Sequence, residues 1–127
     1  MGKYGEAAIN AVHLLAKNEA MPPRLAWETA VEGIFPSSKS SQSKGCPRDA
    51  FLALCGMGKV RHVAPGTYTR SIKNRGYVEC ALAAILSDPS LAKDEKALWQ
   101  MAIGNQRKVH NSQMEVLLTL FQNGYIR

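Results

Sequence analysis

Residues 112–123, SQMEVLLTLFQN, are the stretch that decides the fold. Its apolar residues recur at steps of three and four: Met114, Leu117, Leu118 and Phe121. That spacing places their side chains on one face of an α-helix. Ser112, followed three residues later by Glu115, is the capping-box pattern that begins a helix. The stretch therefore predicts an amphipathic helix whose apolar face packs into a core.

Five more stretches have the same apolar spacing, and prolines or glycines separate most of them. We expect these helices at residues 5–17, 23–34, 47–56, 73–87 and 94–103. With 46% hydrophobic and 20% charged residues, the 127-residue chain has the composition of one globular domain with its own core. The sequence therefore predicts a single all-α domain, residues 1–127, with about six helices.

The segment between the third and fourth of these helices has no helical period. Ala64-Pro65-Gly66-Thr67 is turn chemistry between two short β-prone pieces, residues 60–63 and 67–69. We therefore expect at most one short β-hairpin there, and otherwise an irregular basic linker.

The six helices fall into two related groups of three. Shifts of 73, 72 and 66 residues align the groups in chain order and pair Tyr4 with Tyr77, Trp27 with Trp99, and Gly58 with Gly124. Self-similarity of this kind is typical of duplicated helical units. We expect pseudo-repeat units at residues 4–60 and 77–126, joined by a linker at residues 61–76, with both tryptophans as core anchors.

The basic character of the protein is concentrated in residues 37–76. This stretch holds eight basic residues and one acid, a net charge of +7, whereas the whole chain has a net charge of +6. Positive charge favours partners that carry phosphate or acidic groups. The residues we expect to contact phosphate or nucleic acid are Lys44, Arg48, Arg61, Arg70, Lys73 and Arg75.

The run Ser43-Lys44-Gly45-Cys46-Pro47-Arg48 leads into the third helix. Free N–H groups and the helix dipole both favour an anion at such a helix start, and the flanking cations add to this. The run is not a phosphate-binding Walker motif, because it lacks the required glycine and lysine spacing. The alternative is that these residues only cap the helix and that Pro47 occupies its first position.

Residues 58–75 also resemble the end of the recognition helix and the wing of a winged helix-turn-helix. Against this interpretation, residues 120–126 repeat the same helix ending with no wing after it. The preceding helix carries few side chains that could read bases, so contact with backbone phosphates is the better-supported expectation.

Cys46 is the one catalytic candidate in the sequence. A thiol at a helix start beside Lys44 and Arg48 favours the reactive thiolate, and His62 or His110 would have to act as its base. The alternative is a small packing cysteine. The three cysteines have no zinc-site spacing, so we expect no metal and no cofactor.

The cysteine pattern and the apolar runs indicate the cellular setting. Three widely spaced cysteines favour a reduced cytoplasmic protein. Residues 7–15 are interrupted by Asn10 and His13, so they do not form a signal peptide. No apolar run is long enough to cross a bilayer, and we expect no membrane association.

Three runs of residues resemble those of a family of small uncharacterised bacterial proteins: residues 43–48, 65–71 and 110–114. The resemblance covers essentially the whole chain. It implies a bacterial or phage-related source and carries no activity, cofactor or partner.

We therefore expect a non-enzymatic module that binds phosphate groups, most simply those of nucleic acid, through a basic surface of loop, helix and linker. One alternative is an adaptor that docks an acidic protein partner on the same surface. The other is a small thiol enzyme centred on Cys46.

Overall fold

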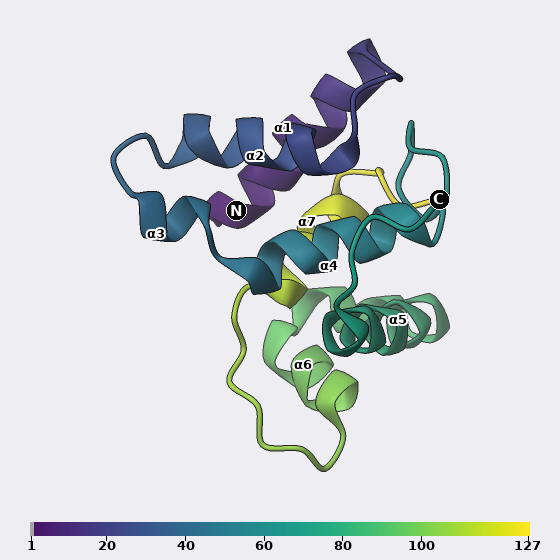
Figure 1. The fold of residues 1–127 in the computed structure, drawn as a ribbon. Coiled ribbons are helices and arrows are strands. Elements are labelled where there is room, and N and C mark those ends of the chain that lie inside the picture. Colours follow the sequence, from purple (N-terminus) through teal and green to yellow (C-terminus); the bar gives the residue numbers. More distant parts are fainter. Residues whose placement is uncertain (1) are drawn as a thin grey trace.

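The computed structural model describes residues 2–127, and the fold is all-α, as the sequence predicts (Figure 1). The helices are α1 (Lys3–Lys17), α2 (Pro23–Ile34), α3 (Lys39–Gln42), α4 (Gly45–Gly56), α5 (Ile72–Ser87), α6 (Glu95–Ile103) and α7 (Gln113–Gln122). A 3₁₀ helix, η1 (Pro89–Lys93), joins α5 to α6. The six expected helices are all present. The serine-rich loop before α4 contains the short α3, which Ser38 caps by accepting a hydrogen bond from the Ser41 N–H.

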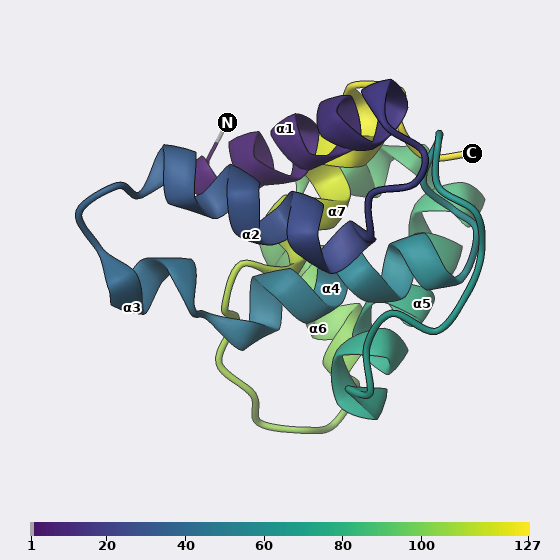
Figure 2. The same cartoon turned by 45° about the horizontal axis from the view of Figure 1, so that its top comes forward.

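The centre of the fold is the pair α4 and α7, which pack against each other. Helix α1 packs on α2 and α7, while α5 packs on α4 and α6 (Figure 2). Because other helices cover α7 on several sides, its buried surface is wider than the predicted stripe. Val116 and Leu120 are fully buried, whereas Phe121 of the stripe is only half-buried. A helix that is apolar on most of its surface is typical of such a central position.

The predicted capping box at Ser112 is wrong. Ser112 has a left-handed backbone (φ 68°) and its side chain caps nothing. His110 takes its place, because its Nε2 accepts a hydrogen bond from the Met114 N–H at 3.0 Å. Glu115 Oε2 instead accepts from the Gly5 N–H at 2.8 Å, at the start of α1. The carboxylate therefore serves the N-terminus of another helix, where negative charge is favourable.

Helix α4 begins two residues earlier than the sequence predicts, at Gly45 with Lys44 as its N-cap. Pro47 lies within the first turn, where its missing N–H costs no helical hydrogen bond. The start of α4 has no side-chain cap and no acidic residue in its first turn.

The hairpin alternative is wrong, because residues 2–127 contain no strand. Val60 instead forms an isolated antiparallel bridge with Ile126. The chain then folds back along α4, where the Gly66 N–H donates to the Gly56 carbonyl at 3.1 Å. Thr69 donates to Asp49 of α4, and no backbone hydrogen bond within residues 2–127 joins residues 67–69 to residues 60–63, so the linker is irregular. A wing is a β-hairpin, so this segment does not fit the winged helix-turn-helix interpretation.

The ends of α4 and α7 are alike in detail. Gly58 (φ 72°) and Gly124 (φ 81°) follow the two helices with the left-handed backbone that glycine permits. Two backbone hydrogen bonds of 2.9 Å join the ends, one from Arg61 N–H to the Tyr125 carbonyl and one from Arg127 N–H to the Lys59 carbonyl. Arg61 and Arg127 are 66 residues apart, and so are Lys59 and Tyr125. The two bonds therefore join equivalent positions of the two helix ends. The two-unit repeat stays a prediction, and this equivalence supports it.

The two tryptophans differ in how their indole N–H groups are satisfied. Trp99 Nε1 donates to the Lys108 carbonyl at 3.1 Å. Trp27 Nε1 is buried and has no hydrogen-bond partner among residues 2–127. An unsatisfied buried donor costs about 1–3 kcal/mol, whereas a typical made hydrogen bond contributes about 1 kcal/mol.

We therefore expect Trp27→Phe to cost less stability than Trp99→Phe. The loss in the free energy of unfolding should be smaller by at least about 1 kcal/mol. Both variants remove similar volume from the core, so each is the control for the other. Urea unfolding of the two variants measures the difference. An equal or larger loss in Trp27→Phe would contradict the assignment of the unsatisfied donor.

Candidate phosphate-binding cleft

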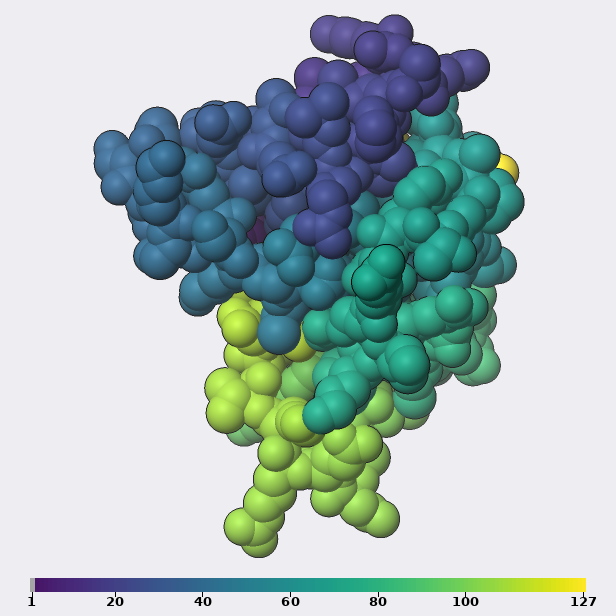
Figure 3. All heavy atoms as spheres, viewed as in Figure 1, coloured from purple at the N-terminus to yellow at the C-terminus, as the bar shows by residue number. Residues whose placement is uncertain are grey.

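A cleft of about 430 Å³ lies between the starts of α2 and α4 and the end of the linker. Its lining residues are Arg24, Arg48, Asp49, Thr67, Tyr68, Thr69, Arg70 and Ser71. In Figure 3 the teal linker lies on the face turned to the viewer, beside the blue helices of the first half of the chain. The cleft therefore combines residues that are far apart in the sequence.

Asp49 fixes the linker against α4. Its carboxylate accepts a hydrogen bond from Thr69 Oγ1 at 3.0 Å and one from Arg48 Nε at 3.2 Å. Thr69 Oγ1 in turn accepts from the Ser71 N–H at 3.2 Å. Ser71 caps α5 by accepting from the Asn74 N–H. The hydrogen bonds of Asp49, Thr69 and Ser71 thus hold the end of the linker between α4 and the start of α5.

The charge of the cleft is positive, with three arginines and one carboxylate. Arg24 and Arg70 are exposed, while the side chain of Arg48 is 28% exposed. Arg48 uses its Nε for Asp49, which leaves its two terminal nitrogens as donors. Guanidinium groups match the oxygens of phosphate in geometry and charge. With nearby threonine and serine hydroxyls, the cleft is suited to a phosphate group.

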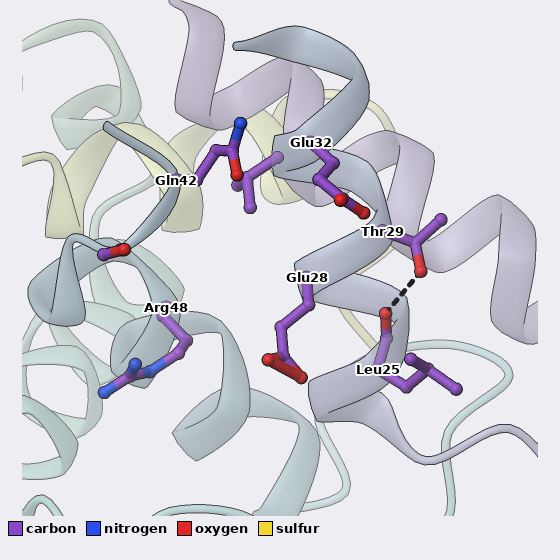
Figure 4. Close-up of a pocket in the computed structure, with 8 residues that line it drawn as sticks. Leu25, Glu28, Thr29, Glu32, Gln42 and Arg48 are labelled. Atoms are coloured by element: carbon purple, nitrogen blue, oxygen red, sulfur yellow. Dashed lines mark hydrogen bonds between the residues drawn. The ribbon is translucent and has the colours of Figure 1, made fainter. Parts of the chain in front are cut away.

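A second hollow of about 420 Å³ lies on the other side of Arg48. It is lined by Leu25, Glu28, Thr29, Val31, Glu32, Gln42, Ser43 and Arg48. Figure 4 shows Glu28 of α2 facing Arg48 of α4 across it. Its two glutamates make it a poor anion site. Residues of the serine-rich loop line this hollow and residues of the linker line the cleft, and Arg48 is the only residue within 2–127 that lines both.

The structure brings Arg48 and Arg70, two of the six expected phosphate contacts, into the cleft. Lys44 is the N-cap of α4. Lys73 lines a separate, smaller pocket. Arg61 donates from Nε to the Gly124 carbonyl at 2.8 Å, and Arg75 donates to Glu79 Oε1 at 2.8 Å on the surface of α5.

Arg24 is the cleft residue that sequence reasoning missed. It follows Pro22-Pro23 outside the basic stretch, on a helix that the repeat treats as scaffold. Only the packing of α2 on α4 brings its side chain to Arg48 and Arg70. Local sequence carries no signal for that contact.

Cys46, the catalytic candidate, is half-buried and lines the smaller pocket with Lys73. No hydrogen bond within residues 2–127 joins it to His62 or His110. Burial raises the pKa of the Cys55 thiol, which makes that cysteine unreactive. No group of three metal-ligating side chains gathers in the described part of the chain. The thiol-enzyme alternative stays a prediction, and neither candidate histidine is hydrogen-bonded to the thiol as its catalytic base.

His110 couples the start of α7 to pH. Burial lowers the pKa of its imidazole below 6.5, and Glu95 and Glu115 oppose that shift. The neutral ring accepts the Met114 N–H, which an imidazolium cannot do. The folded state therefore disfavours protonation, so its stability is full above pH 6.5 and falls as the pH drops towards the lowered pKa.

We expect wild-type protein to lose more stability between pH 7.5 and pH 5.5 than His110→Gln, which keeps an acceptor but does not titrate. Urea unfolding at the two pH values measures this difference, and titration of the other groups cancels in the comparison. Identical pH dependence of the two proteins would exclude His110 as the titrating group.

The fold and the cleft together define a small, basic, all-α protein with a positively charged hollow between helix starts. The chain belongs to the family of unknown function DUF6979, which matches it over residues 1–127. Comparison with curated proteins and with solved structures found no match. Across residues 2–127, no helix has both the length and the apolar character to span a membrane.

Proposed function

We propose that this protein is a non-enzymatic module that binds the phosphate backbone of nucleic acid through the cleft at Arg24, Arg48 and Arg70. The observation that carries the proposal is the convergence of three arginines, from α2, α4 and the linker, on one hollow. A hollow with three guanidinium groups and one carboxylate, itself already hydrogen-bonded, has a net attraction for phosphate.

The surroundings of the cleft favour a polymer over a single phosphate ion. Lys44 continues the positive surface at the start of α4, and Lys73 continues it at the start of α5. Neither helix has an acidic residue in its first turn. A polyanion that extends beyond the cleft would therefore meet further cations at the starts of α4 and α5. The contacts are to the backbone, so we expect little discrimination between base sequences.

The salt dependence of oligonucleotide binding tests the proposal. Fluorescence anisotropy with a labelled 20-mer duplex and its single strand, over a series of NaCl concentrations, gives the slope of log K against log salt. Each phosphate that the protein no longer neutralises flattens the duplex slope by about 0.9. The double variant Arg48→Gln/Arg70→Gln should therefore flatten it by about 2.

The matched control is Arg61→Gln/Arg75→Gln, which removes the same charge from the same basic stretch but outside the cleft. It should leave most of the affinity intact. The proposal fails if wild-type protein binds neither oligonucleotide at low salt, or if the two double variants weaken binding equally. Binding of polyglutamate in place of oligonucleotides would instead support the acidic-partner adaptor.

A further inference from the structure

A smaller cavity of about 150 Å³ lies beside Cys46 at the start of α4, among residues of α5, α6 and the start of α7. We call it the amide pocket. It is lined by Cys46, Lys73, Asn74, Tyr77, Trp99, Lys108, Val109 and Gln113. None of these residues lines the arginine cleft. The pocket draws on four helices and on the loop before α7.

The polar floor of the amide pocket presents hydrogen-bond donors. Asn74 is 8% exposed and Gln113 is 2% exposed. Gln113 Nε2 donates to Asn74 Oδ1 at 3.1 Å, and Asn74 Nδ2 donates to Ser71 Oγ at 3.0 Å. Gln113 Oε1 accepts from the Asn111 N–H at 2.7 Å. Both amide oxygens are thus used within the protein, while each amide nitrogen keeps a second N–H.

The rim of the amide pocket is cationic. Lys73 and Lys108 are exposed and line it, and no aspartate or glutamate does. Neither lysine takes part in an ion pair with a residue in the range 2–127. Two ammonium groups with no lining carboxylate make the pocket attractive to an anion.

The remaining wall is apolar and held in place. Tyr77 and Trp99 pack edge to face with ring centroids 5.2 Å apart. The hydrogen bond from Trp99 Nε1 fixes the Lys108 carbonyl, which positions the loop that carries Lys108 and Val109. The pocket is therefore preformed, so a ligand would not have to order this loop.

We propose that the amide pocket binds a phosphate monoester group whose attached body lies against Tyr77, Trp99 and Val109. Two lysines and two amides bring donors to the cavity, and a phosphate offers more acceptor oxygens to them than a carboxylate does. Lysine is a common phosphate ligand, whereas planar carboxylates are better matched by arginine. The inference goes beyond the proposed function, because no residue lines both hollows, although Lys73 also belongs to the positive surface around the arginine cleft.

Titration with inorganic phosphate, followed by the indole N–H signals in ¹H–¹⁵N NMR spectra, tests the pocket directly. Trp99 lines the pocket and its N–H donates to the Lys108 carbonyl at the rim, whereas Trp27 is fully buried and does not line the pocket. Phosphate should shift the Trp99 indole signal in a saturable way and leave the Trp27 signal in place. Lys73→Gln/Lys108→Gln should weaken this binding by about tenfold or more.

Arg48→Gln/Arg70→Gln is the matched control and should leave the Trp99 titration unchanged. A Trp99 signal that does not move with phosphate, or that moves equally in the lysine variant, overturns the inference. The arginine variant tests the proposed function through oligonucleotide binding, and the lysine variant tests the pocket through the phosphate titration of Trp99. Either proposal can therefore fail while the other holds. Comparing a nucleoside monophosphate with a 5′-phosphorylated oligonucleotide then shows whether the group comes from a small molecule or from a strand end.

Discussion

Gly5→Ala is expected to lower the free energy of unfolding by about 2 kcal/mol or more, although alanine forms helices better than glycine. Gly5 lies in α1 where that helix crosses α7. A Cβ atom at this position would meet Thr119 Oγ1 and would lie 2.9 Å from Thr119 Cβ. Rotating the threonine does not move its Cβ, so α1 and α7 would have to separate. That movement would also stretch the hydrogen bond from the Gly5 N–H to Glu115.

Gly76→Ala is the matched control, because Gly76 is exposed within α5 and a Cβ there would have no atom within 4 Å. It should stabilise the protein by about 0.5–1 kcal/mol, through helix propensity alone. Urea unfolding of both variants gives the comparison. Adding Thr119→Ala should restore part of the stability lost in Gly5→Ala. Equal effects of the two single substitutions would show that the α1–α7 crossing tolerates a methyl group.

The second large effect is expected from Gly56→Ala, at the last residue of α4. A Cβ at Gly56 would lie 2.5 Å from the Gly66 carbonyl oxygen. This oxygen belongs to the backbone, so the linker itself would have to move, and the Gly66 N–H bond to the Gly56 carbonyl would be strained. Overpacking of this kind typically costs about 1–3 kcal/mol. Because the same linker continues to Arg70, the substitution should also weaken oligonucleotide binding.

Gly33→Ala in α2 serves as the control for Gly56→Ala, since a Cβ at Gly33 would meet open space. Like Gly76→Ala, it should stabilise the protein by up to about 0.5–1 kcal/mol through helix propensity, and it should leave the oligonucleotide affinity near that of the wild type. Urea unfolding and anisotropy on the same samples separate the two effects. Unchanged stability in Gly56→Ala would mean that the linker does not rest on α4 as described.

The helices could be predicted because their apolar spacing is a local property. The stripe Met114, Leu117, Leu118 identifies α7 whatever surrounds it. The failures involve partners that are distant in sequence. The pattern Ser112–Glu115 is locally a capping box, yet Glu115 bonds to Gly5, 110 residues away. A hairpin would pair Val60 within the linker, but Val60 pairs with Ile126.

The site shows the same division. The basic stretch indicates Arg48 and Arg70, which the cleft unites. Charge counting could not separate them from Arg61 and Arg75, because sequence position does not say where a side chain points in the folded protein. It also could not supply Arg24, which enters the cleft from α2. The fold, rather than the composition, selects which cations act together.

Two hydrogen bonds that join the first half of the chain to residues in and after α7 affect the order in which the protein can fold. The Gly5 N–H finds its acceptor on Glu115, and Lys59 finds its donor on Arg127. During synthesis, α1 and α4 therefore emerge well before the residues that complete their ends. Contacts of such long sequence separation slow folding relative to helical bundles held by neighbouring segments. A nascent chain that stops before α7 would leave the apolar faces of α1 and α4 uncovered and open to association with other chains.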